Sequence, residues 1–357
     1  MSQAPGLFVP PEFSGSLSAP LPRVISRSNG SPHTTPPLHA PQLVKGQSLR
    51  GAIIAFDIDG TLINHSGEIE KELVDGLREL QARGARIIVA TGRSIPAVMP
   101  ILDVLQLDHE WVVCSNGAVT VRVTRTHDAH SLFGAPDAPL HAHHQKEKRA
   151  PEKRSVPNTQ HKEPSALFTL STAMSYEVID AVTFDPTQVI EILHRALPHA
   201  LIGVEDIGRG FKVSQPFPEG ELIGHEQVVG LEGLTQHPVS RVIMRAPDMD
   251  VEEFRQAVNK VRIESIPWDI GWTAWLDVAP PFTTKAAALQ RLANSLNVIR
   301  SRCVAVGDGT NDETMIAWAG WGIAMGQAAA RTQKRADTVT ATIENNGALD
   351  VVRALLE

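Results

Sequence analysis

From Gly51 to about residue 121, short apolar runs alternate with an amphipathic helical segment. The runs GAIIAFD, ARIIVATGR and WVVCSNGA are continuous and apolar, and each ends in a turn, which is typical of fully buried strands. Between the first two, EIEKELVDGLRELQARG has the spacing of a helix that ends at Gly84. Its apolar face consists of Ile69, Leu73, Leu77 and Leu80. Strands joined by helices pair in parallel through right-handed crossovers, so the sequence predicts a doubly wound parallel α/β sheet.

A second unit interrupts this pattern. Residues 166–281 contain two predicted helices and about five predicted strands, which is typical of a separate α+β layer. The first pattern then returns with a helix from Lys285, the strand RCVAVGDG, a helix from Asp312 and the strand GWGIAMG. We therefore predict a core domain at 49–121 and 282–357, with an inserted α+β cap domain at 122–281.

Two segments lack any such pattern. Residues 1–48 hold nine of the 25 prolines, and residues 124–165 hold six of the 14 histidines among polar and basic groups. Neither composition buries enough apolar surface to offset the chain entropy lost on folding, so we predict both segments to be disordered. The irregular histidine spacing, with no cysteine nearby, favours a solvated insertion into the cap over a metal site.

The bulk properties narrow the classes of partner. The net charge of -7 argues against a general nucleic-acid binder, because phosphate backbones attract basic surfaces. No apolar run reaches the ~18 residues of a membrane span, and the N-terminus lacks a secretory signal pattern. Cys114 and Cys303 each lie in an apolar strand-like run, which indicates buried thiols in a reducing compartment rather than a disulfide. We expect a cytoplasmic protein with no membrane, nucleic-acid or obligate protein partner.

Polar side chains follow the predicted strands at the points where the strands end. In open α/β sheets, ligands bind in the crevice beyond these carboxyl ends. The candidates are Asp57 and Asp59 after the first strand, Thr91 after the second, Asp308 and Asp312 after the fourth, and Lys285 at a helix start. Taken singly, each has an ordinary explanation as a turn, cap or surface residue. Their joint occurrence predicts one site; to Arg93 we assign no role, and Asn116 we interpret as a turn residue.

The charges of this cluster indicate a cation. Four carboxylates carry -4 when ionised, and Lys285 supplies only +1, so the group would repel itself in a partly buried site. A divalent cation would reduce the imbalance to -1, and a raised pKa on one aspartate would remove the rest. All-oxygen ligands with room for water suit Mg²⁺.

At this point the sequence resembles a known family. DIDGT (57–61), ATGR (90–93), Lys285 in PPFTTKAAAL and GDGTND (307–312) match, in order, the four motifs of haloacid dehalogenase superfamily phosphatases. SNGA (115–118), the position of the inserted domain and the run GWGIAMGQA resemble the Cof-type branch. The resemblance covers 51–121 and 282–357 well and 166–281 only in outline. Ala286 and Gln327 depart from the usual glycine and asparagine.

The resemblance implies a role for each candidate. Asp57 would be the nucleophile that forms an aspartyl-phosphate, and Asp59 the acid that protonates the leaving alcohol and then activates water. Mg²⁺ would be held by the Asp57 carboxylate, the Asp59 backbone carbonyl and Asp308. Thr91 and Lys285 would bind phosphoryl oxygens, with Asn311 and the amide of Gly92 as weaker candidates. Asp312 would orient Lys285 or a metal-bound water.

The leading hypothesis is therefore a Mg²⁺-dependent phosphatase acting on small phosphorylated metabolites, such as sugar phosphates. A cap over the crevice would exclude water and polymers, which disfavours phosphoproteins as substrates. Two alternatives stay open. A sugar phosphomutase would carry the same motifs, and a non-catalytic regulatory protein could keep this core and work through its long tails.

Overall fold

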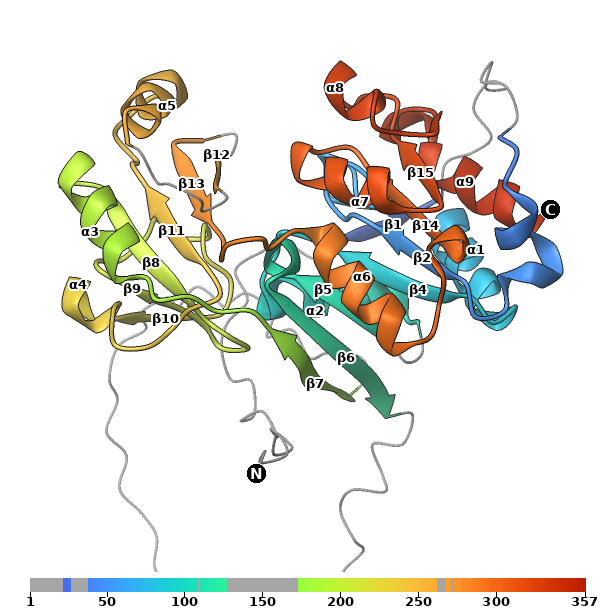
Figure 1. Cartoon of the computed structure of the whole chain (residues 1–357), viewed down its shortest axis with the longest axis horizontal. Helices are drawn as coiled ribbons and strands as arrows, with labels where there is room; N and C mark the ends of the chain where they lie inside the picture. Colours follow the sequence, from blue (N-terminus) through green and yellow to red (C-terminus); the bar gives the residue numbers. More distant parts are fainter. Residues whose placement is uncertain (1–21, 27–37, 108–109, 127–172, 262–267, 271–272) are drawn as a thin grey trace, which may run out of the picture.

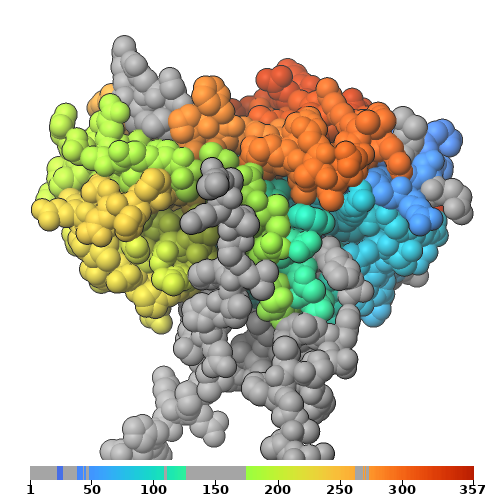
Figure 2. All heavy atoms as spheres, turned by 60° about the horizontal axis from the view of Figure 1, so that its bottom comes forward, coloured from blue at the N-terminus to red at the C-terminus, as the bar shows by residue number. Residues whose placement is uncertain are grey.

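The computed structural model describes residues 22–26, 38–107, 110–126, 173–261, 268–270 and 273–357. These residues form two domains, each built on its own sheet, that lie side by side (Figures 1 and 2). The greater part of the predicted disordered tail and all of the predicted His-rich insertion beyond Thr126 lie outside the described residues. Among the described helices, none has both the length and the apolar character needed to cross a membrane.

The core domain contains a sheet of eight strands in the order β16-β15-β14-β2-β4-β5-β6-β7. Its strands are β2 (Ile53–Phe56), β4 (Arg86–Ala90), β5 (Glu110–Cys114), β6 (Val119–Thr126), β7 (Ala173–Ala181), β14 (Cys303–Gly307), β15 (Trp321–Ala324) and β16 (Thr338–Val339). The strands from β16 to β5 pair in parallel, whereas β6 and β7 are antiparallel additions. The predicted fold class, a doubly wound α/β core with an inserted α+β cap, is confirmed.

Successive side chains of the central strand β2 point to opposite faces of the sheet, as in any pleated strand, and pack against two different layers of helices. Ile54 and Phe56 pack into the cluster that contains α1 (Lys71–Ala82), α2 (Ile95–Leu105) and α9 (Gly347–Leu356). Ile53 and Ala55 face the opposite layer, which contains α6 (Lys285–Ser295) and α7 (Glu313–Trp318). Both faces of β2 are therefore buried between the two helical layers (Figure 1).

The core sheet extends beyond the boundary predicted at residue 121. Strand β6 runs to Thr126, where Ala173 of β7 lies opposite it, so the predicted cap boundary falls inside a core strand. The reason is the period-two pattern of β6: Val119, Val121 and Val123 point inward and are buried in the core. The cap therefore begins after β7, and residues 124–126 belong to the sheet rather than to a disordered insertion.

The cap is a second sheet with the strand order β10-β9-β8-β11-β13-β12. Its strands are β8 (Leu201–Asp206), β9 (Gly210–Val213), β10 (His225–Val228), β11 (Val242–Arg245), β12 (Trp268–Ile270) and β13 (Trp275–Val278). Helices α3 (Thr187–Ala196) and α5 (Val251–Asn259) cover one face of this sheet (Figure 1). The described part of the cap thus has six strands, one more than predicted, with a short extra helix α4 (Gly230–Gly233).

Part of the N-terminal segment that we predicted to be disordered is folded. Two 3-10 turns lie at Gln42–Val44 and Gly46–Leu49. The side chain of Val44 is fully buried in the main core cluster, as is that of Leu49, the first residue after the predicted tail. Strand β1 (Arg23–Ile25) pairs in parallel with β3 (Glu68–Glu70). The structure differs from the prediction at 22–26 and 38–48. The 3-10 turns have neither the helical nor the strand periodicity that a sequence pattern can reveal. Strand β1 has only three residues, too few for an alternating pattern to stand out.

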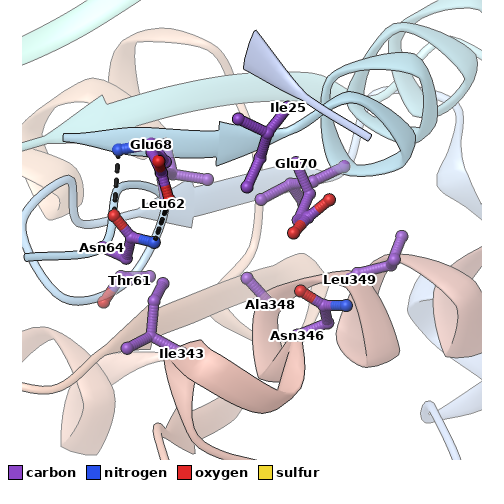
Figure 3. Close-up of a pocket in the computed structure, with 11 residues that line it drawn as sticks. Ile25, Thr61, Leu62, Asn64, Glu68, Glu70, Ile343, Asn346, Ala348 and Leu349 are labelled. Atoms are coloured by element: carbon purple, nitrogen blue, oxygen red, sulfur yellow. Dashed lines mark hydrogen bonds between the residues drawn. The ribbon is translucent and has the colours of Figure 1, made fainter. Parts of the chain in front are cut away.

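Strand β1 packs closely on the core. Ile25 on one side and Ala348 and Leu349 of α9 on the other line a cavity of about 20 Å³ (Figure 3), which has room for about one water molecule. Thr61 also lines this cavity, and its hydroxyl donates to Asp308 at 3.3 Å. Thr61 therefore lies both at the cavity beside β1 and next to Asp308, one of the predicted site residues.

Candidate active site

The predicted site residues meet at the carboxyl edge of the core sheet. The register places Phe56 of β2 between Val306 of β14 and Val89 of β4, so these three strands end at the same level. Asp57 follows β2, Thr91 follows β4 and Asp308 follows β14. This is the crevice in which ligands bind in open α/β sheets.

Lys285 is the centre of the cluster. It is the first residue of α6, whose start is capped by Thr284, and its side chain is completely buried. Its ammonium donates to Oδ1 of Asp57 at 2.6 Å and to Oδ1 of Asp312 at 2.7 Å. The other oxygen of Asp312 accepts from the amides of Asp308 and Gly309 at 3.0 and 2.8 Å. Asp312 thus connects Lys285 to the turn that carries Asp308.

The loop after β5 packs closely against the first turn of α6 and so helps to position it. Gly117 has a φ of +98°, and a Cβ atom there would lie 2.2 Å from the carbonyl oxygen of Thr284. Only glycine fits both the left-handed backbone and this contact. The SNGA motif therefore has a structural function, which is to let the loop after β5 pack against the helix that begins with Lys285.

The cluster carries more negative than positive charge. Burial, followed by the repulsion from Asp312, raises the pKa of Asp57 to about 8, although Lys285 partly offsets both effects. The same two causes raise the pKa of Asp308 to about 6. Burial alone would lower the pKa of Lys285, but Asp312 and Asp57 outweigh it and the pKa is raised. Lys285 is therefore a permanent cation whose single charge does not neutralise three aspartates.

The structure brings three of the four predicted carboxylates together. Oxygens of Asp57, Asp308 and Asp312 lie within 4.8 Å of one another.

Asp59 lies outside this cluster. Its side chain is 60% exposed and accepts two hydrogen bonds from the guanidinium of Arg93, at 2.8 and 2.6 Å. Burial alone would lower the pKa of Arg93, but the bond to Asp59 raises it. Sequence reasoning assigned Arg93 no role, and no local signal links two residues 34 positions apart.

The remaining candidates line the rim of the same crevice. Thr91 is buried, and its hydroxyl accepts from the amide of Arg93 at 3.1 Å. Asn311 donates to the side chain of Asn116 at 2.9 Å, and Gly92 lies against that same side chain. Asn116, which we interpreted only as a turn residue, is thus part of the rim.

The donor set fits a hard divalent cation. The three clustered carboxylates offer only oxygen ligands and carry excess negative charge, the combination that suits Mg²⁺. Asp312 already uses both oxygens for Lys285 and the backbone, which leaves Asp57 and Asp308 as the available carboxylates. Gly60 lies so close to Asp308 that a Cβ atom would come within 2.4 Å of its carboxylate. The backbone at 59–60 therefore borders the same space.

The two departures from the family motifs leave this arrangement intact. Gln327 donates to the carbonyl of Gly60 at 2.6 Å and accepts from the amide of Ile343 at 3.0 Å, so it ties the loop after β2 to the C-terminal region. Ala286 packs at the edge of the apolar cluster beneath α6.

The sequence matches the model of one known protein family. The model for haloacid dehalogenase-like hydrolases matches residues 54–133 and 221–352. The chain belongs to this family. The resemblance to a haloacid dehalogenase superfamily phosphatase of the Cof-type branch is confirmed, as is the expected enzyme class, a hydrolase of that superfamily.

Two curated relatives come from Bacillus subtilis (strain 168). Phosphatase YwpJ is 26% identical to this chain over 314 residues, which cover 85% of this chain and 99% of YwpJ. The putative phosphatase YxeH is 27% identical over 309 residues, which cover 85% of this chain and 98% of YxeH.

Solved structures share the fold at lower identity. The phosphatase BT1666 from Bacteroides thetaiotaomicron superimposes with a TM-score of 0.59 at 21% identity, covering 89% of this chain and 98% of its own. The subclass IIB sugar phosphatase BT4131 superimposes with a TM-score of 0.59 at 19% identity, covering 85% and 98%.

Proposed function

We propose that this hydrolase is a Mg²⁺-dependent phosphatase that cleaves small phosphorylated metabolites through an aspartyl-phosphate on Asp57. The observation that carries the proposal is the buried bridge of Lys285 between Asp57 and Asp312, with Asp308 beside it. An ammonium fixed at the end of a parallel sheet, next to a carboxylate with a free oxygen, is suited to transfer of a phosphoryl group. Such transfer depends mainly on positioning and charge stabilisation.

Asp57 supplies the nucleophile. Its Oδ1 is held by Lys285, so Oδ2 is the oxygen that attacks phosphorus. The new Oδ2–P bond forms as the bond between phosphorus and the leaving oxygen breaks, and the alkoxide takes a proton from Asp59. Asp59, now ionised, removes a proton from water, which attacks the aspartyl-phosphate and releases inorganic phosphate. Lys285 and Thr91 would bind the phosphoryl oxygens, with the Gly92 amide and Asn311 at the rim.

The observed pairing of Asp59 corresponds to one half of this cycle. Both of its carboxyl oxygens accept from the guanidinium of Arg93, an arrangement compatible with the second half, in which Asp59 accepts a proton from water. To protonate a leaving group, Asp59 has to leave Arg93 and bind a proton. Because the side chain of Asp59 is exposed, it has room to move away from Arg93 and to exchange a proton with solvent.

Asp57, Asp308 and the backbone carbonyl of Asp59 are the proposed ligands of Mg²⁺. When bound, the ion would neutralise negative charge on the phosphoryl group and on the carboxylates. Asp57 would then be kept ionised, and hence nucleophilic, at a pH below the value of about 8 that burial imposes on it.

The substrate class follows from the position of the site. The clustered carboxylates and Lys285 are buried or half-buried and the cap lies against the loops around them, so a compact phosphomonoester fits better than a polymer. The fold neighbour BT4131 is described as a sugar phosphatase, which makes sugar phosphates the first compounds to test. The small substrate is the only partner that we propose.

A reducing cytoplasmic location stays part of the proposal. Cys114 and Cys303 are both free and buried, and burial raises the pKa of Cys303 to about 11. A thiol of that kind is inert at neutral pH and serves as a small apolar residue of the core.

A metabolite screen tests the proposed function. We expect purified protein to release inorganic phosphate from at least one sugar phosphate in the presence of Mg²⁺, and not after chelation with EDTA. Phosphate release should match substrate loss one to one. A phosphomutase would consume substrate with almost no release, and a regulatory protein would consume none, so either result would refute the proposal.

Mg²⁺ binding should strengthen with pH. Protons and the cation compete for Asp57 and Asp308, and below a pKa of about 8 the displacement of one proton costs roughly tenfold in affinity per pH unit. We therefore expect the Mg²⁺-induced rise in Tm to be larger at pH 8.5 than at pH 6.0, as measured by differential scanning fluorimetry. The variant Asp308→Asn should lose most of this rise. A shift that is equal at both pH values would contradict the assignment of these ligands.

A further inference from the structure

A charged residue of the cap touches the loop that follows β4. Arg241 precedes β11, and its side chain is 9% exposed. Its Nη1 donates to the carbonyl oxygen of Gly92 in the core at 2.8 Å and to Asp277 in the cap at 3.4 Å. The guanidinium carbon lies 5.3 Å from the centre of the Phe211 ring. Arg241 therefore sits on the helix-free face of the cap sheet and reaches into the core at the edge of the active site.

A second contact crosses between the domains at the same place. Glu205 of β8 lies opposite Arg241, and its side chain is 2% exposed. Its carboxylate accepts from the hydroxyl of Ser115 in the core at 2.7 and 2.8 Å, and from Ser240 in the cap at 3.0 Å. Nε of Arg241 is 3.6 Å from this carboxylate and has no hydrogen-bond partner.

The two contacted core loops form one unit. The amide of Ser115 donates to the carbonyl of Arg93 at 2.9 Å, and the amide of Asn116 donates to the carbonyl of Thr91 at 3.0 Å. A force on Gly92 or on Ser115 is therefore transmitted to the residues that carry the Thr91 hydroxyl and the Arg93 guanidinium. Arg93 in turn holds Asp59.

Stability alone is a poor explanation for this ion pair. A buried Arg–Glu pair gains little over apolar residues of similar size, and here one buried donor atom is left without a hydrogen-bond partner. What the pair provides instead is a directional contact from the cap to one peptide group of the core, the one that joins Gly92 to Arg93.

We propose that Arg241 is a positioning residue for the general acid and base. With the cap against the core, its bond to the Gly92 carbonyl fixes the Gly92–Arg93 peptide, and so fixes the side chain of Arg93 that places Asp59. The geometry of Asp59 thereby depends on the position of the cap. This inference rests on the proposed phosphatase function.

The test compares two leaving groups in the variant Arg241→Met. A 4-nitrophenolate departs without a proton, whereas an alkoxide needs one from Asp59. The ratio kcat/KM reports only the steps up to departure of the leaving group, so it leaves out the hydrolysis of the aspartyl-phosphate that both substrates share. We expect kcat/KM for the best alkyl phosphate of the metabolite screen to fall about 30-fold, a part of the ~10²–10⁴ that general acid catalysis supplies, and kcat/KM for 4-nitrophenyl phosphate to fall less than about fivefold. A substrate-dependent loss of this kind would not follow from a general loosening of the fold.

Arg245→Met is the matched control. Arg245 lies four residues further along, is 11% exposed and pairs with Glu221 at 2.9 Å inside the cap. We expect its ratio of alkyl to aryl kcat/KM to equal that of the unmodified protein. Equal losses on both substrates in Arg241→Met, or the same ratio in both variants, would overturn the inference.

A third variant covers failure of Arg241→Met to fold. Lysine at this position keeps one cationic donor but cannot bond Gly92 and approach Glu205 together, so Arg241→Lys should give an intermediate ratio. An unchanged ratio in Arg241→Lys would overturn the inference while leaving the proposed function in place. Absence of any turnover in the unmodified protein would overturn both.

Discussion

Replacing Asp57 with asparagine is expected to lower kcat for every phosphomonoester substrate by about 10⁴-fold or more, because the amide cannot form the acyl-phosphate bond. The side chain keeps its shape, so Lys285 can still donate to the Oδ1 position and to Asp312. The loss should therefore appear in kcat measured under Mg²⁺ saturation, with little change in the folded structure. Phosphate release from 4-nitrophenyl phosphate is the simplest measurement.

Asp75→Asn provides the control for this experiment. Asp75 is a half-exposed carboxylate on α1 that pairs with Lys71 and takes no part in the carboxylate cluster. Its variant should keep the activity of the unmodified protein, and both variants should have a similar Tm. Substantial turnover by Asp57→Asn, in the absence of turnover by a mock purification from cells without the protein, would refute the assignment of the nucleophile.

Replacing Lys285 with methionine should affect both activity and stability. It removes the one cation between two buried carboxylates, and leaving a buried charge without its partner costs about 3–5 kcal/mol. We expect kcat to fall about 10³-fold because a fixed positive charge at the phosphoryl group is lost. Chemical denaturation at pH 7.5 with and without Mg²⁺ measures the first effect, and phosphate release the second.

The stability loss in Lys285→Met should depend on pH. Without the ammonium, the protonated form of Asp57 is favoured further in the folded state, so the pKa of Asp57 stays above its value in the unfolded chain. Stability from such groups is present at low pH and is lost as pH rises through the folded value. The variant should thus be closest to the unmodified protein near pH 5 and furthest from it near pH 8.

Lys71→Met is the matched control for this variant. Lys71 also begins a helix and also pairs with an aspartate, but its side chain is 58% exposed. Exposed pairs contribute about 0–1 kcal/mol, so this variant should change little at any pH. Equal effects of the two substitutions would show that Lys285 is not the buried bridge described above.

Local patterns predicted the parts of the site that lie directly on strand ends. The parallel sheet follows from continuous apolar runs, and once those strands are in register Asp57, Thr91 and Asp308 have to meet at one edge. Asp57 and Lys285 both belong to the core domain. They could therefore be selected from a single sequence, without knowing how the cap docks on the core.

Local sequence patterns could not predict the contacts between segments that are distant along the chain. The pairing of Asp59 with Arg93 depends on how two turns approach each other. The position of Asp59 at the end of the first predicted strand had placed it with the other carboxylates. The contacts of Glu205 and Arg241 with the core depend on the docking of two domains. The buried Val44 was missed because irregular backbone can fill a core as well as a helix can.

The order of the chain has a consequence for its synthesis. Asp57 and Lys285 are separated by 228 positions, and strand β2 lies between β4, which is made early, and β14, which is made late. A ribosome-bound fragment that ends within the cap has the proposed nucleophile Asp57 but neither Lys285 nor Asp308. Under the proposed mechanism an incomplete chain is therefore inactive, and the enzyme becomes competent only after its final segment has joined the sheet.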